Sequence, residues 1–393
     1  MATQTVGIEE RRARLALRHR LAPSAAAAGP AEVADSMVAL HGTDPSSVFL
    51  AVFARSRAPS VPAVEDALYA ERRLVRMLGM RRTMFVVTRD LAPVVQAACT
   101  AAIATQLRRT LVRHLTEAGV ATDCAAWLAA LEDATAAALT ARGQASATEL
   151  AEDVPLLRTP MRMAVGKPYE AEVYVTTRVL FQLAADGRIV RARPRGSWTS
   201  SQYRWAPLES WLPGGFPGWP AEAAQVELAR RWLRRFGPAT VEDLRWWTGW
   251  TLGQTRKALA QLAPVEVDLS GVPGVLLPDD VEPVSCEEPW TALLPALDPT
   301  PMGWAARRWY LGEHSTALFD RSGNIGPTVW CDGRIVGGWA QRKDGSIAYR
   351  LLADVGSESA AAVAGAAQRL AGTLGPVRVT PRFRTPLERE LSA

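Results

Sequence analysis

Residues 188–208, RIVRARPRGSWTSSQYRWAPL, are the stretch that decides the fold class. β-Branched and aromatic residues on both sides of Gly196 predict a strand, a turn and a second strand. Apolar residues at helical spacing precede this hairpin in three segments, 124–143, 146–154 and 174–187. Ser146 is a suitable N-cap for the second helix. Three helices followed by a β-hairpin are typical of a winged helix, so residues 120–214 are expected to form one.

The same order of elements occurs on both sides of this unit, which indicates a tandem arrangement. On the N-terminal side we expect helices at 11–22, 33–42, 45–56 and 64–78, a strand at 80–88 and a long helix at 91–119. On the C-terminal side we expect a hairpin at 265–278 after helices at 221–237, 240–249 (N-cap Thr240) and 251–262. Residues 1–119 and 215–282 are therefore predicted to be the first and third winged helices.

Helical spacing largely stops after residue 283. The segment 328–355, TVWCDGRIVGGWAQRKDGSIAYRLLADV, predicts strands separated by Asp-Gly and Gly-Gly turns, and a helix at 357–375 and a strand at 377–383 follow. Proline- and glycine-rich or acidic stretches at 212–220 and 279–289 mark boundaries. The expected fold class is α+β, with three tandem winged helices and a small β-barrel-like domain at 283–393.

Composition excludes several classes of protein. No window approaches the run of about 20 apolar residues that a membrane helix needs, and AAAAGPA at 25–31 is too short for a signal peptide. We therefore expect a cytoplasmic protein. The four cysteines lie far apart without a C-x-x-C pair, and the usual nucleotide-binding and zinc-hydrolase motifs are missing. No metal and no nucleotide cofactor are expected.

The basic residues point to a polyanion partner. The formal net charge is +5, and of 45 basic residues only Lys167, Lys257 and Lys343 are lysines. Guanidinium groups suit bidentate phosphate contacts, although an arginine preference of a GC-rich genome explains the same count. The residues predicted to contact DNA are Arg81, Arg82, Arg191, Arg193, Arg195, Trp198, Arg204 and Arg342. The alternative for the hairpin is a solvated surface with ordinary cross-strand aromatics. The tryptophans of RWWTGW at 245–250 are expected to pack in a domain interface.

The stretch LHGTDPSSVFLAVFAR at 40–55 joins two predicted helices and gathers polar side chains. Gly42 is expected to end the first helix, and Asp44 followed by Pro45 is the N-cap and N1 pair of the next. A helical corner explains the stretch by itself. His41, Asp44 and Ser46 do not form a hydrolase triad, because no nucleophile elbow surrounds them.

Three further segments carry a resemblance: MRRTMFVV (80–87), LLPALDPTPMGW with RRWYLG (293–312), and NIGPTVWCDGRIVGGWAQR (324–342). Together with the domain order they resemble the AlkZ-like winged-helix DNA glycosylase family over nearly the whole chain. The resemblance implies winged helices and a β-barrel around a DNA channel, and hydrolysis of the N-glycosidic bond of bulky alkylated purines or of crosslinks. It implies no metal.

The resemblance also implies a site. Family members place Gln-x-Gln or Gln-x-Asp between the second and third helices of the first domain, and alignment through VALHG carries these positions to Asp44-Pro45-Ser46. The glutamines are replaced here. An alkylpurine that is already cationic leaves without protonation, so the enzyme has to stabilise an oxocarbenium-like sugar and orient one water. Asp44 would supply the negative charge, His41 would hold the water or the carboxylate, and Ser46 or Ser47 would add hydrogen bonds.

The leading hypothesis is thus a monomeric, monofunctional DNA glycosylase for alkylated bases in double-stranded DNA, in repair or in self-resistance to a genotoxic natural product. A transcription regulator or non-catalytic DNA-binding protein would use the same helices, but it commonly reads half-sites as a two-fold dimer. A scaffold that binds no nucleic acid would require the arginines of the hairpin to be incidental.

Overall fold

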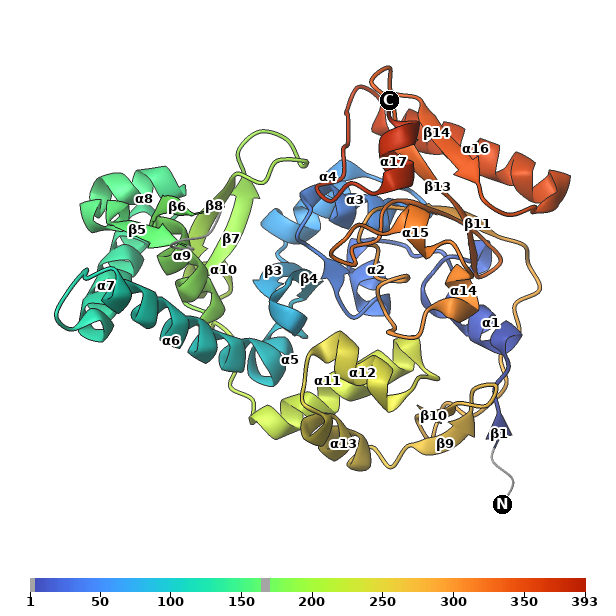
Figure 1. Ribbon diagram of the computed structural model, residues 1–393, viewed down its shortest axis with the longest axis horizontal. Helices are drawn as coiled ribbons and strands as arrows, with labels where there is room; N and C mark the ends of the chain where they lie inside the picture. The colour runs from blue at the N-terminus through green and yellow to red at the C-terminus, as the bar shows by residue number, and fades with distance from the viewer. Residues whose placement is uncertain (1–3, 164–169) are drawn as a thin grey trace.

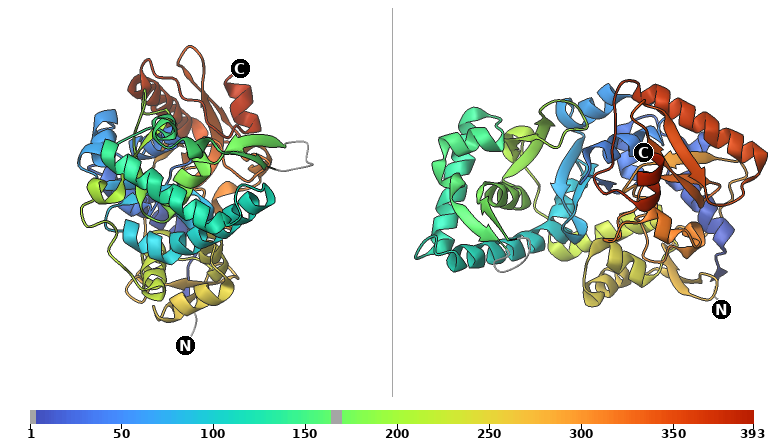
Figure 2. Two further views of the ribbon diagram at one scale, coloured as in Figure 1. Left: turned by 90° about the vertical axis from the view of Figure 1, so that its left-hand side faces the viewer. Right: turned by 45° about the horizontal axis from the view of Figure 1, so that its top comes forward.

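The computed structural model describes residues 4–163 and 170–393, which form two lobes (Figure 1). The smaller lobe, at the left of Figure 1, contains α7, α8, α9 and the hairpin β7–β8, and α6 leads into it. The smaller lobe also contains β5, β6 and α10 (Leu208–Trp211), whereas the larger lobe contains the remaining elements. Figure 2 shows the same separation from another side. Among the described residues, no helix is long and apolar enough to cross a membrane.

The first segment combines helices with a small sheet. Its helices are α1 (Ile8–Arg18), α2 (Pro30–Ser36), α3 (Pro45–Phe53), α4 (Val61–Glu65), α5 (Ala92–Val95) and α6 (Ala101–Glu117). The sheet has the order β2 (Leu40–His41), β4 (Met84–Thr88), β3 (Leu74–Leu78), with His41 opposite Phe85. The predicted helix at 64–78 is wrong over 74–78, where the chain forms β3. Arg72 has a φ of 55°, so the chain reverses there and pairs with β4.

We had expected Gly42 to end a helix, and this prediction is wrong. α2 stops at Ser36, and Val38, at a φ of 59°, turns the chain into β2. The Gly42 N–H donates to the Met84 carbonyl at 2.7 Å, which continues the ladder between β2 and β4. A glycine is needed here because a Cβ would lie 2.9 Å from Nη1 of Arg76.

The next two segments follow the predicted order. α7 (Cys124–Arg142), α8 (Ala147–Asp153) and α9 (Thr176–Ala185) precede β7 (Ile189–Pro194) and β8 (Tyr203–Pro207). α11 (Ala221–Phe236), α12 (Val241–Thr248) and α13 (Leu252–Ala260) precede β9 (Val265–Asp268) and β10 (Pro273–Leu276). Ser146 and Thr240 each form a capping box, as their positions predicted. The second segment also contains the pair β5 (Pro160–Met163) and β6 (Ala171–Tyr174), and β1 (Gln4–Thr5) joins the third sheet beside β9.

The C-terminal segment contains an open sheet, so the predicted barrel is wrong. The antiparallel order is β11 (Thr291–Leu294), β12 (Thr328–Cys331), β13 (Arg334–Gln341), β14 (Ile347–Leu351), and the two edge strands do not pair with each other. The other elements are α14 (Arg308–Leu311), α15 (Ser315–Leu318), α16 (Gly356–Leu374) and α17 (Pro386–Leu391). Residues 377–383 form no strand, because the Gln341 side chain bonds the Val377 carbonyl and the Val379 N–H instead.

The main core is continuous through the larger lobe. It joins residues of the first, third and C-terminal segments and takes in the β7–β8 hairpin of the second, whereas α7, α8 and α9 enclose a separate cluster. Arg55, just after α3, forms a bidentate pair with Asp298, with N–O distances of 2.8 and 2.7 Å, and neither side chain is exposed. Arg55 also donates to the His19 carbonyl and to Thr300. The first and last segments are therefore locked together.

Candidate active site

Asp44 caps α3 and is fully engaged in doing so. Its Oδ1 accepts from the Ser46 N–H at 3.0 Å and from the Ser46 hydroxyl at 2.7 Å. Its Oδ2 accepts from the Arg382 N–H at 2.9 Å, and the residue is only 4% exposed. The Ser47 hydroxyl donates to the Ala296 carbonyl at 2.7 Å. The carboxylate is thus held in place between the corner and the C-terminal segment.

His41 lies in β2 and is not hydrogen-bonded to Asp44. Its ring is buried, with its centroid 5.4 Å from that of Phe85, and its Nδ1 has no hydrogen-bond partner among the described residues. Burial lowers the pKa of His41 to about 3, and the charge of Arg81 adds to this shift. The imidazole is therefore neutral at pH 7 and keeps a free ring nitrogen.

Thr43 is a residue that the sequence interpretation missed. Of residues 41–47 it is the only one that is not buried. Thr43 lies in a bend between the end of β2 at His41 and the start of α3. Arg76 supports this part of the corner by donating from Nη1 to the Gly42 carbonyl at 2.6 Å. No signal in the sequence indicated Thr43, because its partial exposure depends on how the chain packs around the corner.

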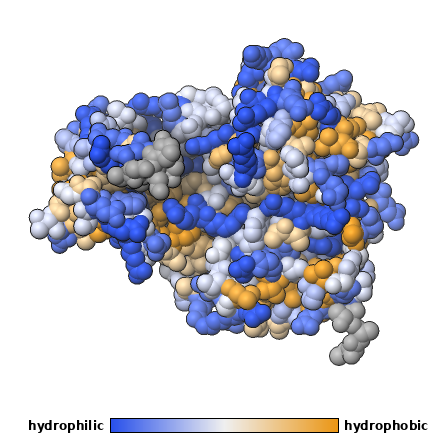
Figure 3. All heavy atoms as spheres, in the orientation of Figure 1, coloured by the Kyte–Doolittle hydropathy of each residue, from blue (hydrophilic) through white to orange (hydrophobic). Residues whose placement is uncertain are grey.

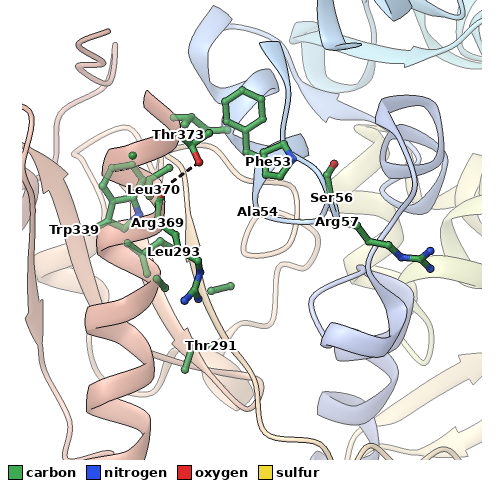
Figure 4. Close-up of a pocket in the computed structure, with 15 residues that line it drawn as sticks. Phe53, Ala54, Ser56, Arg57, Thr291, Leu293, Trp339, Arg369, Leu370 and Thr373 are labelled. Atoms are coloured by element: carbon green, nitrogen blue, oxygen red, sulfur yellow. Dashed lines mark hydrogen bonds between the residues drawn. The ribbon is translucent and has the colours of Figure 1, made fainter. Parts of the chain in front are cut away.

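The cavities near α3 limit where a base can approach. Beneath Asp44, Ser46 and Ser47 lies a cavity of about 10 Å³, which is too small for a nucleobase. A cavity of about 600 Å³ lies at the opposite end of α3, between Phe53, β11 and the Arg369 side of α16 (Figure 4). The corner does not line this larger cavity. Thr43, the one partly exposed residue of 41–47, is therefore the point at which a base could approach the corner.

The predicted DNA-binding arginines differ in whether their guanidinium groups are already bonded to other groups of the protein. Arg193 pairs with Glu65 at 2.5 Å and Arg195 with Glu149 at 2.8 Å. Arg204 donates to the Gln144 carbonyl, and Arg342 donates to the Leu391 carbonyl. Arg191 has its Cζ 5.3 Å from the Tyr203 ring centroid, and burial lowers its pKa to about 10. Among the described residues, neither Arg81 nor Arg82 forms an ion pair with a carboxylate.

The sequence led us to expect Trp198 on an exposed surface of the wing, but the side chain is buried. It is 6% exposed, and its ring centroid lies 4.8 Å from that of Phe49 and 6.2 Å from that of Phe53. Both phenylalanines belong to α3. Trp198 therefore anchors the loop between β7 and β8 to the helix of the corner, because this apolar contact outweighs exposure to water. In this conformation the indole is not available for stacking on a base.

The tryptophans of RWWTGW lie where we expected them, between segments. Trp247 and Trp250 are buried, and the Trp250 indole donates to the Ala98 carbonyl at 3.0 Å. Trp246 is partly exposed. Within the described residues, no group of three or more histidine, cysteine or acidic side chains is placed to hold a metal ion.

The fold is shared with a DNA glycosylase. The solved structure of the Streptomyces sahachiroi DNA glycosylase AlkZ matches with a TM-score of 0.73 and 20% sequence identity, over 97% of this chain and 100% of that chain. The family model described as DNA glycosylase AlkZ-like matches residues 34–373. The chain belongs to the AlkZ-like DNA glycosylase family, which confirms the resemblance seen in the sequence. A search of curated proteins found no match.

Proposed function

We propose that the protein is a monofunctional DNA glycosylase that excises bulky or cationic alkylated purines, such as N7-alkylguanine and N3-alkyladenine, from double-stranded DNA. The observation that carries the proposal is the family match over residues 34–373, which includes the whole corner. We further propose that it acts as a monomer in the cytoplasm, in repair or in self-resistance to a genotoxic natural product. The division into units 1–119, 120–214, 215–282 and 283–393 is part of the same proposal.

The geometry refines the roles first assigned to the corner. Because three hydrogen bonds occupy both oxygens of Asp44, its role is a fixed negative charge that stabilises the oxocarbenium-like sugar. The water is held by the free Nδ1 of His41 and by the Thr43 hydroxyl. A neutral imidazole of such low pKa is a weak base, so it orients the water rather than taking its proton early. Ser46 acts by fixing the carboxylate.

The lysines favour hydrolysis without a covalent intermediate. A Schiff base with the sugar needs a free amine of lowered pKa. Lys257 forms an ion pair with Glu222, and Lys343 lies in the turn between β13 and β14. Lys167 lies outside the described residues. Borohydride should therefore trap no adduct on lesion-containing DNA, and an adduct lost on mutation of one lysine would overturn this part of the mechanism.

The decisive assay is base release under single-turnover conditions from duplex DNA with one N7-alkylguanine. We expect Asp44→Asn to lower the rate at least about 100-fold, and His41→Ala and Thr43→Val about tenfold each. Asp123→Asn is the matched control, because Asp123 caps α7 through the same kind of bonds far from the corner. Asparagine at 44 turns a donor toward the Arg382 N–H, so each rate is measured well below the unfolding temperature of the variant.

One observation favours a second function. The family glutamines are replaced and Asp44 is saturated with hydrogen bonds, as in a purely structural cap. A non-catalytic DNA-binding protein or regulator has these features. A wild-type protein that releases no base, and that prefers one palindromic operator at physiological salt, would support this alternative over the glycosylase. An unchanged rate in Asp44→Asn would instead reject only the role of Asp44.

A further inference from the structure

The turn between β3 and β4 has an unusual backbone. Arg81 and Arg82 are consecutive residues with φ values of 54° and 56°, a region that side chains other than glycine rarely adopt. The turn rests against the end of α12, where a Cβ at Gly249 would lie 3.1 Å from Cγ and 3.3 Å from N of Arg81. Gly249 itself has a φ of 77°. This close approach fixes the backbone from which both guanidinium groups extend.

Two guanidinium groups share one indole at this turn. The Cζ of Arg81 lies 4.0 Å from the Trp246 ring centroid, and that of Arg307 lies 4.7 Å from the same centroid. The Cζ of Arg307 also lies 5.1 Å from the centroid of the Phe319 ring. Arg81, Arg307 and Trp246 are partly exposed, and Arg82 is exposed. A planar aromatic surface can orient guanidinium groups while their N–H donors remain available.

Within the described chain, no carboxylate lies within ion-pair distance of Arg81, Arg82 or Arg307. Both acids of α12 are engaged elsewhere: Glu242 pairs with Arg245, and the oxygens of Asp243 accept from the Thr240 hydroxyl and from the N–H groups of Ala305 and Ala306. Like charges repel, and burial together with Arg307 lowers the pKa of Arg81 to about 10. Bringing these cations together without a counter-charge is unfavourable unless an anion binds there.

We propose that Arg81 and Arg307, which share the Trp246 indole, bind one backbone phosphate of the DNA beside the candidate active site together with Arg82, the residue that follows Arg81. The proposal rests on the proposed function in that DNA is the ligand. A cationic alkylpurine would be repelled by these groups, whereas a phosphate diester accepts from several guanidinium donors at once. The turn leads directly into β4, whose Met84 carbonyl accepts from the Gly42 N–H and whose Phe85 lies opposite His41, so the proposed phosphate lies next to the corner.

The location agrees with the surface of the molecule. Hydrophilic side chains form a band across the middle of the face in Figure 3, between the C-terminal elements above and α11 and α12 below. The turn after β3, the segment before α14 and the end of α12 meet in the same region of the fold.

The test combines protein variants with neutral phosphates. Short duplexes carry a stable abasic-site analogue and one methylphosphonate, which is moved along the strand from one duplex to the next. We expect wild-type protein to lose affinity about tenfold at one phosphate or two adjacent ones, and Arg82→Gln and Arg307→Gln to lose about tenfold on the unmodified duplex. These variants should lose no further affinity with the methylphosphonate at that position. Arg308→Gln is the matched control, because this neighbouring arginine is exposed and pairs with Glu313.

Several outcomes would overturn the proposal. If the affinity loss caused by an arginine variant and the loss caused by the methylphosphonate multiply at every position, the arginines contact no particular phosphate. An equal loss in Arg308→Gln would show a general effect of charge. Stabilisation of the wild type by inorganic phosphate, with no position-dependent loss in the scan, would indicate a site for a free anion. Thermal melting of each variant checks that it is folded.

Failure of this site is distinguishable from failure of the proposed function. The scan measures binding and needs no base release. If the expected position-dependent pattern appears and no base is released, the glycosylase assignment fails and the phosphate site stands. If base is released and the effects are multiplicative, the phosphate site fails and the glycosylase assignment stands.

Discussion

The neutral state of His41 has a consequence for stability. Its pKa is about 3 in the folded protein, where burial and Arg81 lower it, and about 6.5 in the unfolded chain. Between these values the unfolded chain binds a proton that the folded state does not bind. The contribution of His41 to stability is therefore complete above pH 6.5 and declines as the pH falls toward 3. Buried His19, whose pKa is also lowered, acts in the same direction.

We therefore predict that His41→Gln flattens the fall of the unfolding free energy between pH 7 and pH 4.5. Urea denaturation at a series of pH values measures this slope. His114→Gln serves as control, because His114 is only partly buried on α6. Equal slopes in wild type and His41→Gln would mean that His41 is protonated in the folded state, and the water-orienting role would then be wrong.

The residue scale also shows how far the sequence could lead. Asp44 as N-cap, Pro45 at N1 and the contact with Ser46 follow from local rules, and the structure confirms them. The other oxygen of Asp44 accepts a hydrogen bond from the Arg382 N–H, and Arg382 is 338 residues away in the chain. No local pattern encodes such a contact. The catalytic role of Asp44 therefore stays a prediction, whereas its structural role is explained completely.

At the scale of elements, predictions succeeded where local signals agreed with one another. The helices of the second and third segments have clear periodicity, three of them (α8, α12 and α13) have capping boxes, and all of the predicted helices were found. The segment Leu74–Leu78 is a short apolar run, which periodicity alone cannot assign to a helix or a strand. Residues 377–383 have strand-like composition but bond to the Gln341 side chain. These assignments depended on partners distant in the sequence.

Trp198 gives a prediction at the scale of an element. Since its indole packs on α3, we expect Trp198→Ala to lower the free energy of unfolding by about 3–5 kcal/mol and to speed amide exchange in β7 and β8. Trp219→Ala is the control, because Trp219 is 40% exposed in the linker before α11. Stability close to wild type, with a loss of DNA affinity alone, would restore the original assignment of Trp198 as a stacking residue.

At the scale of the whole molecule, the predicted sequence of four units describes the order of elements but not their packing. The main core contains residues of all four segments, and the second segment has a large cluster of its own in addition. The patterns that predict helices and hairpins act over a few residues. The Arg55–Asp298 pair joins residues that lie 243 positions apart, so it was not predictable from them.

We predict that Asp298→Asn lowers the free energy of unfolding by about 3–5 kcal/mol, because it leaves the buried guanidinium of Arg55 without its counter-charge. The double variant Arg55→Met with Asp298→Leu should be less damaging than the sum of the two single changes. Glu390→Gln, which breaks the exposed pair with Arg350, should cost at most about 1 kcal/mol. Chemical denaturation provides all of these values. Additive effects at 55 and 298 would show that the pair is not coupled.

The Arg55–Asp298 pair also bears on how the protein is made. A ribosome adds about 5–20 residues per second, so Asp298 emerges roughly 12–50 s after Arg55. During that interval the Arg55 guanidinium lacks the Asp298 carboxylate. The C-terminal sheet, β11 to β14, is also not yet present to cover the apolar face of α3. The second segment, with its own cluster, can fold on the ribosome in the meantime. The N-terminal segment therefore stays incompletely packed, and open to chaperones, until about three-quarters of the chain has been synthesised.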